Sequence, residues 1–424
     1  MSGRAASAAI VIMIVASCST AAPPGETAVE PSPTSSSAVA SPVASSAPPP
    51  VASSAPPPVA TASLSPAPTP RLDDVVKSFK LVSPGTGWAE TDHGLLVTHD
   101  DGSSWVDVSP NGDLVLDAHF VGDAGLGTLA MDAVDGQTAF VTTEKTDGGT
   151  TTLSIWHTTD GGQTWRPAKL ASVPALDTSS DCGCESLSVL IDAVDPLVVF
   201  ADIVETGGTD DVSHDVFRSQ DGGVTWAALS FGIHATGSSP DLAIHFLTAD
   251  TGSIVFDERT FTTRTGWGHW SEYPEPGSGP VPYPGFGPAT YLDDRHWIMG
   301  LTLAGTVLIA ESTDAGRTWT THTRPIPKPG NLSVSFVSAM TWIATISTTS
   351  GPPADKVGPA ETWTSRDAGT TWTFVGKLPT SDTWRSVFVD PSHAWVITSA
   401  GGLATTSDGG ATWSAILGAP LSGG

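Results

Sequence analysis

Basic residues are scarce in this sequence. Lys and Arg together number 18 against 44 Asp and Glu, which gives a formal net charge of −26. Such a surface repels phosphate backbones and anionic headgroups. The composition therefore argues against nucleic-acid binding and against electrostatic binding to anionic lipid. It suits a soluble surface, and it would disfavour anionic substrates wherever no local Arg residues compensate.

Cysteine is also rare, with three residues in the chain. Cys182 and Cys184 form an Asp-Cys-Gly-Cys-Glu motif, and outside the cytoplasm we expect them to be oxidised. Two interpretations stay open: a strained loop disulfide, or a redox or metal site whose two further ligands have no recognisable spacing. The sequence has no Ser/His/Asp spacing, no phosphate-binding glycine loop and no His-based metal motif. We therefore predict no catalytic residue, no metal and no cofactor.

The N-terminus has the organisation of a signal peptide. A short positive start, Met1–Arg4, precedes an apolar run, Ala5–Ala16, that is too short to span a membrane as a mature helix. The run ends in Val15-Ala16-Ser17-Cys18, which resembles a bacterial lipobox. The resemblance implies cleavage before Cys18, acylation of that cysteine, and a place on the extracytoplasmic face of the bacterial cell membrane. The alternative is an ordinary signal peptide that contains a cysteine.

A Pro/Ser/Ala-rich tether follows the lipobox. Residues 19–70 contain no aromatic side chain, and their only charges are Glu26 and Glu30. Such a segment cannot bury a core and is expected to be disordered and extended. We therefore divide the chain into a signal peptide over 1–17, a lipidated cysteine with its disordered linker over 18–72, and a repeat domain over 73–424.

A motif of the form S/T-x-D-x-G-x-T-W recurs through the repeat domain, with Ser in place of the second Thr in the first copy. Its hydroxyl and carboxylate groups can accept hydrogen bonds from backbone N–H groups of a turn, and its glycine can supply a positive φ. The final Trp then starts the return strand. The six near-complete copies carry Asp100 and Trp105, Asp160 and Trp165, Asp221 and Trp226, Asp314 and Trp319, Asp367 and Trp372, and Asp408 and Trp413. A seventh copy ends at Trp270 and lacks the aspartate and the first glycine.

This motif resembles the Asp-box, or BNR repeat, of β-propeller proteins. Successive box tryptophans lie 41 to 61 residues apart, which suits a four-stranded blade with variable loops. We predict an all-β fold: a single seven-bladed β-propeller of four-stranded antiparallel blades. In the first blade we expect strands at Ser78–Val82, Gly87–Glu90, Gly94–Thr98 and Ser104–Val108. The degenerate fourth unit is the weakest blade of the prediction.

The meander topology separates two faces of the ring. The turns between third and fourth strands, which hold the boxes, lie on one face, here the corner face. The turns between second and third strands and the loops between blades lie on the opposite face, here the loop face. Long insertions at Lys145–Thr151, Glu205–Ser213, Ser271–Ala289 and Ser350–Ala360 fall on the loop face. Long loops on a rigid scaffold often carry function, although loops also simply tolerate insertion.

The insertions define a candidate binding face. Aromatic side chains held by Pro and Gly make good anchors, and acidic neighbours favour a cationic partner. The predicted residues are Glu205, Asp210, Asp211, Tyr273, Tyr283, Phe286 and Asp355.

The Asp-box also occurs in sialidases, so a carbohydrate-active enzyme is the alternative function. A sialidase-like site needs an arginine cluster for the sugar carboxylate and a Tyr nucleophile with a Glu partner. The Arg-Ile-Pro motif typical of sialidases is absent, and Thr323–Pro327 is only a scrambled version of it. A glycoside hydrolase with two carboxylates resembles the xyloglucan-active enzymes, which pair two propellers, whereas this chain has room for one.

The overall resemblance is to single-domain propellers of the photosystem II stability/assembly factor type. Those factors bind a partner protein through a basic patch, and this acidic chain shows no such patch. We predict a non-catalytic, lipid-anchored binding or assembly scaffold, acting as a monomer on a protein or glycan partner.

Overall fold

The computed structural model describes residues 74–110, 131–147, 149–174, 186–207, 211–229, 242–256, 259–273, 289–303, 306–328, 330–348, 358–378, 383–398 and 400–418. The chain divides into two contact units, Met1–Ala60 and Thr61–Gly424, and all described residues belong to the second. The signal peptide, Cys18 and the linker therefore lie outside the described residues, and so do Cys182 and Cys184.

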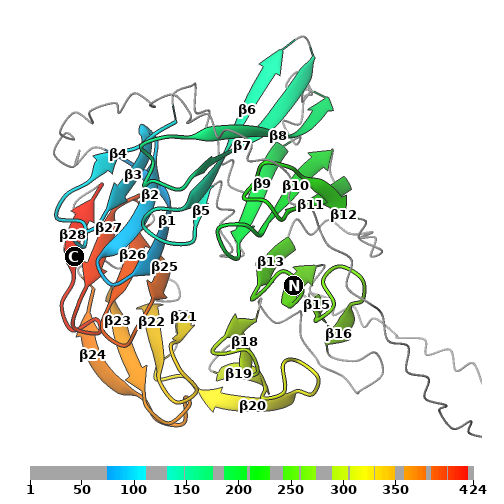
Figure 1. The fold of residues 1–424 in the computed structure, drawn as a ribbon. Helices are drawn as coiled ribbons and strands as arrows, with labels where there is room; N and C mark the ends of the chain where they lie inside the picture. Colours follow the sequence, from blue (N-terminus) through cyan, green and yellow to red (C-terminus); the bar gives the residue numbers. More distant parts are fainter. Residues whose placement is uncertain are drawn as a thin grey trace, which may run out of the picture. The chain divides into compact units, whose positions relative to one another are not determined.

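Seven four-stranded antiparallel sheets make up the described part of the chain (Figure 1). Each sheet pairs its strands in sequence order, and the first strands of neighbouring blades contact one another, as β1 does β5 and β9 does β13. The predicted seven-bladed propeller is confirmed, and the fourth unit forms a complete sheet. None of the described residues forms a helix long and apolar enough to cross a membrane.

The strands of the first four blades have the following bounds. Blade one contains β1 (Val76–Ser83), β2 (Thr86–Thr91), β3 (Gly94–Thr98) and β4 (Val106–Asp107). Blade two contains β5 (Met131–Ala133), β6 (Ala139–Asp147), β7 (Thr150–Thr158) and β8 (Arg166–Pro174). Blade three contains β9 (Ser186–Ala193), β10 (Val199–Gly207), β11 (Asp211–Ser219) and β12 (Ala227–Leu229). Blade four contains β13 (Leu242–Phe246), β14 (Gly252–Phe256), β15 (Arg259–Thr263) and β16 (Ser271–Tyr273).

The last three blades repeat the same order. Blade five contains β17 (Thr290–Tyr291), β18 (Trp297–Leu303), β19 (Thr306–Ser312) and β20 (Thr320–Pro325). Blade six contains β21 (Asn331–Phe336), β22 (Trp342–Thr348), β23 (Gly358–Ser365) and β24 (Thr373–Lys377). Blade seven contains β25 (Thr383–Phe388), β26 (Ala394–Thr398), β27 (Leu403–Thr406) and β28 (Ser414–Leu417).

The core lies between the sheets. Because side chains alternate along a strand, each sheet presents one apolar face to each neighbouring blade. One cluster joins Trp88 and Leu95 of blade one to Met131 and Val141 of blade two, all fully buried. Large aromatic side chains recur near the start of the second strand, at Trp88, Phe140, Phe200, Trp297, Trp342 and Trp395. Their burial removes much apolar surface from water at each junction between blades.

The six complete box copies fold into nearly identical corners. In blade one, the Thr98 hydroxyl accepts hydrogen bonds from the N–H groups of Asp100 and Gly102 and donates one to Asp100 Oδ1. Asp100 Oδ1 accepts the N–H of Ser104 at 2.8 Å, and Oδ2 accepts the Ser104 hydroxyl at 2.6 Å. The corners built on Asp160, Asp221, Asp314, Asp367 and Asp408 make the equivalent carboxylate bonds to a Thr.

Four expected loops are partly strand, one of them Ser350–Ala360, in which β23 begins at Gly358. The β6–β7 ladder continues to Asp147 opposite Thr150, and the β10–β11 ladder continues to Gly207 opposite Asp211. These ladders replace much of the loops expected at Lys145–Thr151 and Glu205–Ser213, and the Thr residues at 146, 150, 151 and 206 suit extended backbone. Ser271–Tyr273, expected within a loop, is the outer strand β16.

Candidate functional site

The candidate binding residues do not converge on one site within the described part of the chain. Glu205 lies on β10 and Asp211 begins β11, so both belong to the same hairpin of blade three. Tyr273 ends β16 on blade four, where it pairs with Thr260. The remaining members lie outside the described residues: Asp210, Tyr283, Phe286 and Asp355.

Two long hairpins, β6–β7 and β10–β11, stand on the loop face of neighbouring blades. Figure 1 shows β6 and β7 extending beyond the other strands of the ring. Along these hairpins, Leu153 and Val173 of blade two share an apolar cluster with Leu187 and Ile203 of blade three. The hairpins are thus continuous with the core, which holds their backbones in place. Sequence reasoning placed function on these segments but expected irregular loops.

A buried contact between His214 and Asp202 links the two strands of the blade-three hairpin. His214 Nδ1 lies 2.8 Å from Asp202 Oδ2, with 5% and 0% of the two side chains exposed. Burial raises the pKa of the Asp202 carboxyl, and the hydrogen bond from His214 opposes that rise. Because solvent cannot reach the pair, it serves to hold the hairpin together rather than to react. The sequence offers one hint of this contact. Side chains alternate along the strand, which places Asp202 on the same face as the apolar Phe200.

Polar contacts also join the first strands around the inner ring. Lys80 Nζ of blade one lies 2.6 Å from Asp132 Oδ1 of blade two, and Asp132 Oδ2 accepts the N–H of Ala193 of blade three. Asp192 repeats the arrangement by accepting the N–H of Phe246 of blade four at 2.7 Å. The repeated sequences Met-Asp-Ala-Val at 131–134 and Ile-Asp-Ala-Val at 191–194 carry this link, and sequence reasoning missed it.

One group of described residues brings metal-ligand atoms together. The Nδ1 atom of His93 lies 3.0 Å from Asp74 Oδ1 and 2.9 Å from Asp92 Oδ1. The three ligand atoms lie within 4.8 Å of one another on the loop face of blade one. The N–H of Val75 also donates to Asp92, and together with the imidazole it lowers the pKa of that carboxyl against the opposing effect of desolvation. Exposed acidic groups commonly gather in this way without a metal ion, so the cluster by itself does not indicate a metal site.

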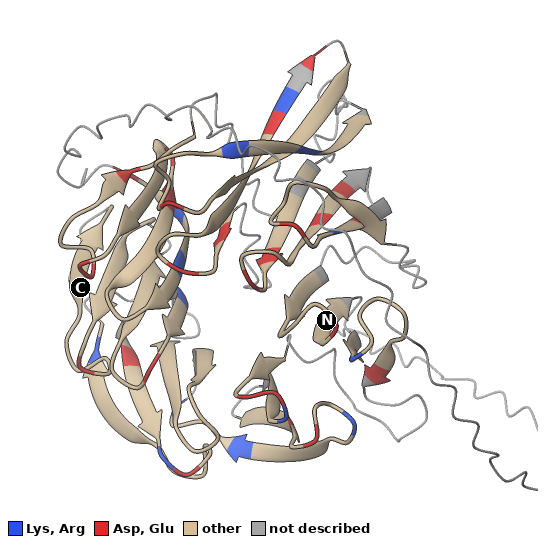
Figure 2. Cartoon of the chain, viewed as in Figure 1, with Lys and Arg blue, Asp and Glu red and all other residues tan. Residues whose placement is uncertain are grey.

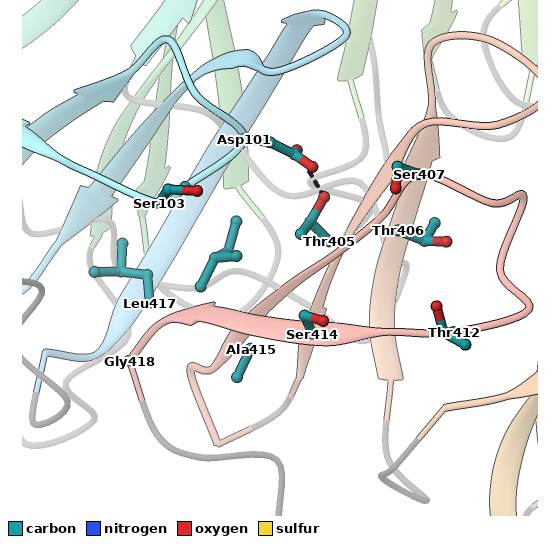
Figure 3. A pocket seen from close by; sticks show the side chains of 12 residues that line it. Asp101, Ser103, Thr405, Thr406, Ser407, Thr412, Ser414, Ala415, Leu417 and Gly418 are labelled. Carbon is teal, nitrogen blue, oxygen red and sulfur yellow. Dashed lines mark hydrogen bonds between the residues drawn. The ribbon is translucent and has the colours of Figure 1, made fainter.

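A groove of about 600 Å³ lies on the corner face where blade seven meets blade one (Figure 3). Asp101 projects from the corner of blade one, and its Oδ1 accepts the Thr405 hydroxyl at 2.7 Å and the Trp395 indole N–H at 3.3 Å. The opposite wall consists of hydroxyl and small apolar side chains, among them Ser407, Thr412, Ser414 and Ala415. Asp101 is the single charged residue of its lining, so this groove is nearly neutral.

No family model matches this sequence, and no curated protein matches it. Solved structures with a similar fold include YCF48 bound to D1 peptide, at 17% identity, with 81% of this chain and 99% of that chain covered and a TM-score of 0.45. A GH74 enzyme from Niastella koreensis shows 12% identity, 80% and 65% coverage and a TM-score of 0.37. The NanB sialidase from Streptococcus pneumoniae shows 13% identity, 64% and 56% coverage and a TM-score of 0.30. With TM-scores below 0.5, these likenesses carry no conclusion about the partner, substrate or site of this chain.

Proposed function

We propose that the protein is a non-catalytic binding scaffold, anchored by lipid outside the cell membrane, whose partner docks on the loop face of blades two and three. The observation that carries the proposal is the pair of hairpins β6–β7 and β10–β11, which extend the sheets on that face and rest on a shared apolar core. Rigid projecting elements lose little conformational entropy when a partner docks on them.

The charge of this surface favours a cationic partner. On the blade-three hairpin, Asp215 is exposed and Glu205 is partly exposed, while Asp211 begins β11. Arg218 is the only Lys or Arg between 199 and 219. Acidic groups at the rim of an interface speed the approach of a cationic protein and make association sensitive to salt.

Trimming a hairpin tests the docking face. Replacing Lys145–Thr152 by Asn-Gly joins Glu144 to Leu153, which already face each other in the ladder, through a two-residue turn. We expect the trimmed protein to remain folded and to lose the envelope proteins that the wild type captures at low salt. Arg366→Ala on the corner face is the control and should capture the same set. Identical capture by the trimmed variant would contradict docking on this face.

The lipid anchor and the absence of catalysis need separate tests. Cys18→Ser should release the protein from membranes or leave it unprocessed, because the lipobox cysteine is the proposed site of acylation. If the variant is processed and fractionates like the wild type, the anchor is wrong. Incubating the purified protein with sialosides and xyloglucan tests the second point, and turnover of either substrate would overturn the non-catalytic assignment.

A further inference from the structure

A second groove, of about 220 Å³, lies on the corner face between blades four and five. One wall is formed by β15, β16 and the degenerate box between them, and the other by the corner of blade five. Its lining includes Arg264, His269, Glu272, Arg317 and Trp319.

This groove occupies the same place in the repeat as the neutral groove between blades seven and one. Thr262 and Thr263 line the one groove as Thr405 and Thr406 line the other, where the second residue of each pair is the first residue of its box. On this alignment, Arg264 stands at the position of Ser407.

The other positions of the groove wall also carry larger polar or charged side chains than their counterparts in the first groove. His269 stands at the position of Thr412, and Glu272 at that of Ala415. On the facing corner, Arg317 takes the place that Ser103 has in blade one. The fold therefore builds the same groove twice, once with Asp101 as its one charged residue and once with Arg264, Glu272 and Arg317.

The degenerate box leaves these side chains available. In the six complete corners, the box Asp holds the hydroxyl of the residue four positions later. In blade four, Thr265 replaces the Asp and His269 replaces that hydroxyl residue. The Thr263 hydroxyl still accepts the N–H of Thr265 and donates to the carbonyl of Gly266, so the turn keeps part of its support.

The two guanidinium groups that line the groove outnumber its one carboxylate, that of Glu272. The Arg264 and Arg317 side chains are exposed, and neither guanidinium group forms a hydrogen bond or an ion pair with another described residue. Figure 2 shows how thinly Lys and Arg are spread over the described ribbons, among more numerous Asp and Glu. Two guanidinium groups in one small groove therefore stand out against the charge of −26.

We propose that this groove binds a small oxyanion, carried as a carboxylate, phosphate or sulfate group by a small ligand. The planar guanidinium groups of Arg264 and Arg317 suit two-point hydrogen bonding to such a group, and two of them outweigh the one carboxylate of Glu272. The Trp319 side chain offers an apolar wall for the body of the ligand. The site is on the corner face, so it is independent of docking on the loop face.

Titrating the full-length protein with four probes tests the site: acetate, glucuronate, inorganic phosphate and sulfate, at constant low ionic strength, by calorimetry. We expect saturable binding of at least one probe, weakened about tenfold or more by Arg264→Ala or by Arg317→Ala, which is the effect of losing one charge-assisted hydrogen bond. The probe that binds most tightly distinguishes a carboxylate ligand from a phosphate or sulfate ligand.

Two further variants control for charge and for geometry. Arg366→Ala removes the same charge from another corner and should leave the affinity unchanged. Arg317→Lys keeps the charge without the planar fork and should weaken binding part of the way. Absence of saturable binding for all four probes would overturn the proposal, as would equal weakening by Arg366→Ala, because binding would then reflect only net charge.

Discussion

Asp101 and Thr405 lie 304 positions apart in the sequence, yet the Asp101 carboxylate accepts the Thr405 hydroxyl at 2.7 Å. The bond crosses the junction at which blade seven meets blade one. Nearby, the Trp105 indole N–H donates to the carbonyl of Ile416 at 3.0 Å. Among the described residues, β1–β4 and β25–β28 each stay within their own blade, and the ring closes through these side-chain contacts and the backbone hydrogen bond from Val76 N–H to the Gly401 carbonyl at 2.9 Å.

The backbone conformation of Asp101 is energetically unfavourable, and the hydrogen bond to Thr405 offsets this. Asp101 has φ of 58°, in the left-handed region, where the other complete corners have Gly or Ala. A side chain in that region is less favourable than glycine, and Asp tolerates it better than most residues. We interpret the Asp as retained for its bond across the junction.

Asp101→Ala and Thr405→Val, alone and together, test this interpretation. Each single variant should lower the free energy of unfolding by about 1–2 kcal/mol, and the double variant by less than the sum, with a coupling of about 1 kcal/mol. Chemical denaturation of the four proteins measures it. Strict additivity would show that the two residues do not interact in solution.

The corner carboxylates should stabilise the six blades that have a complete box. Asp314→Ala removes the acceptor of the Thr318 N–H and hydroxyl bonds, at 2.8 and 2.7 Å, and should lower the free energy of unfolding by about 1–2 kcal/mol. The loss should be greatest in blade five, since repeat scaffolds distribute stability over neighbouring units. Hydrogen exchange measures the loss of protection in each blade. Uniform loss over all seven blades would argue against a local role of the Asp314 carboxylate.

Much of this architecture follows from the sequence, since the corners, the blade number and the second-strand aromatics all depend on spacing within one repeat. The grooves could not be predicted, because the sequence does not give the offset between neighbouring blades. That offset decides that Arg264 and Arg317 line the same groove. The Asp101–Thr405 contact depends on ring closure in the same way. The long hairpins were missed for a different reason: Gly and Asp at their tips indicate a turn, but how far the strands continue toward Thr150 or Asp211 depends on packing beneath them.

Acid should destabilise the corners within a defined pH window. The hydrogen bonds from Thr318, led by that from its backbone N–H, lower the pKa of Asp314 to about 2, and similar bonds lower the pKa of the other five corner carboxyls. A lowered pKa in the folded state means that the unfolded chain takes up protons first. The resulting stability is therefore complete above about pH 4 and is lost as the pH falls toward 2.

Thermal unfolding between pH 7 and pH 2 measures this loss. We expect the melting temperature to fall below about pH 4, where the unfolded chain begins to take up protons first. Asp314→Asn should unfold at a lower temperature than the wild type at pH 7, and the difference should shrink at pH 2. A difference that stays constant over this range would mean that Asp314 does not titrate as its contacts indicate.

The ionisation of Glu90 should affect stability in the opposite direction, lowering it as the pH rises. Glu90 is fully buried between blades one and two, Oε2 accepts the Ser78 hydroxyl at 2.8 Å, and no described residue donates a hydrogen bond to Oε1. Burial raises the pKa of this carboxyl, although Ser78 and the positive charge of Lys77 oppose the rise. A raised pKa means that the folded state holds the proton longer, so stability is lost as the pH climbs from the ordinary value of 4.5 through the folded-state pKa.

Two substitutions at this buried carboxyl make the prediction testable. Glu90→Gln is neutral at every pH, so it should gain about 1–2 kcal/mol relative to the wild type between pH 4 and pH 8. Ser78→Ala removes the donor that stabilises the charged carboxylate, and it should lose more stability at pH 8 than at pH 4. Denaturation of the three proteins at both pH values gives the comparison. If the gap between Glu90→Gln and the wild type stays the same at both, Glu90 ionises as readily in the folded protein as in the unfolded chain, and its burial must be relieved by water.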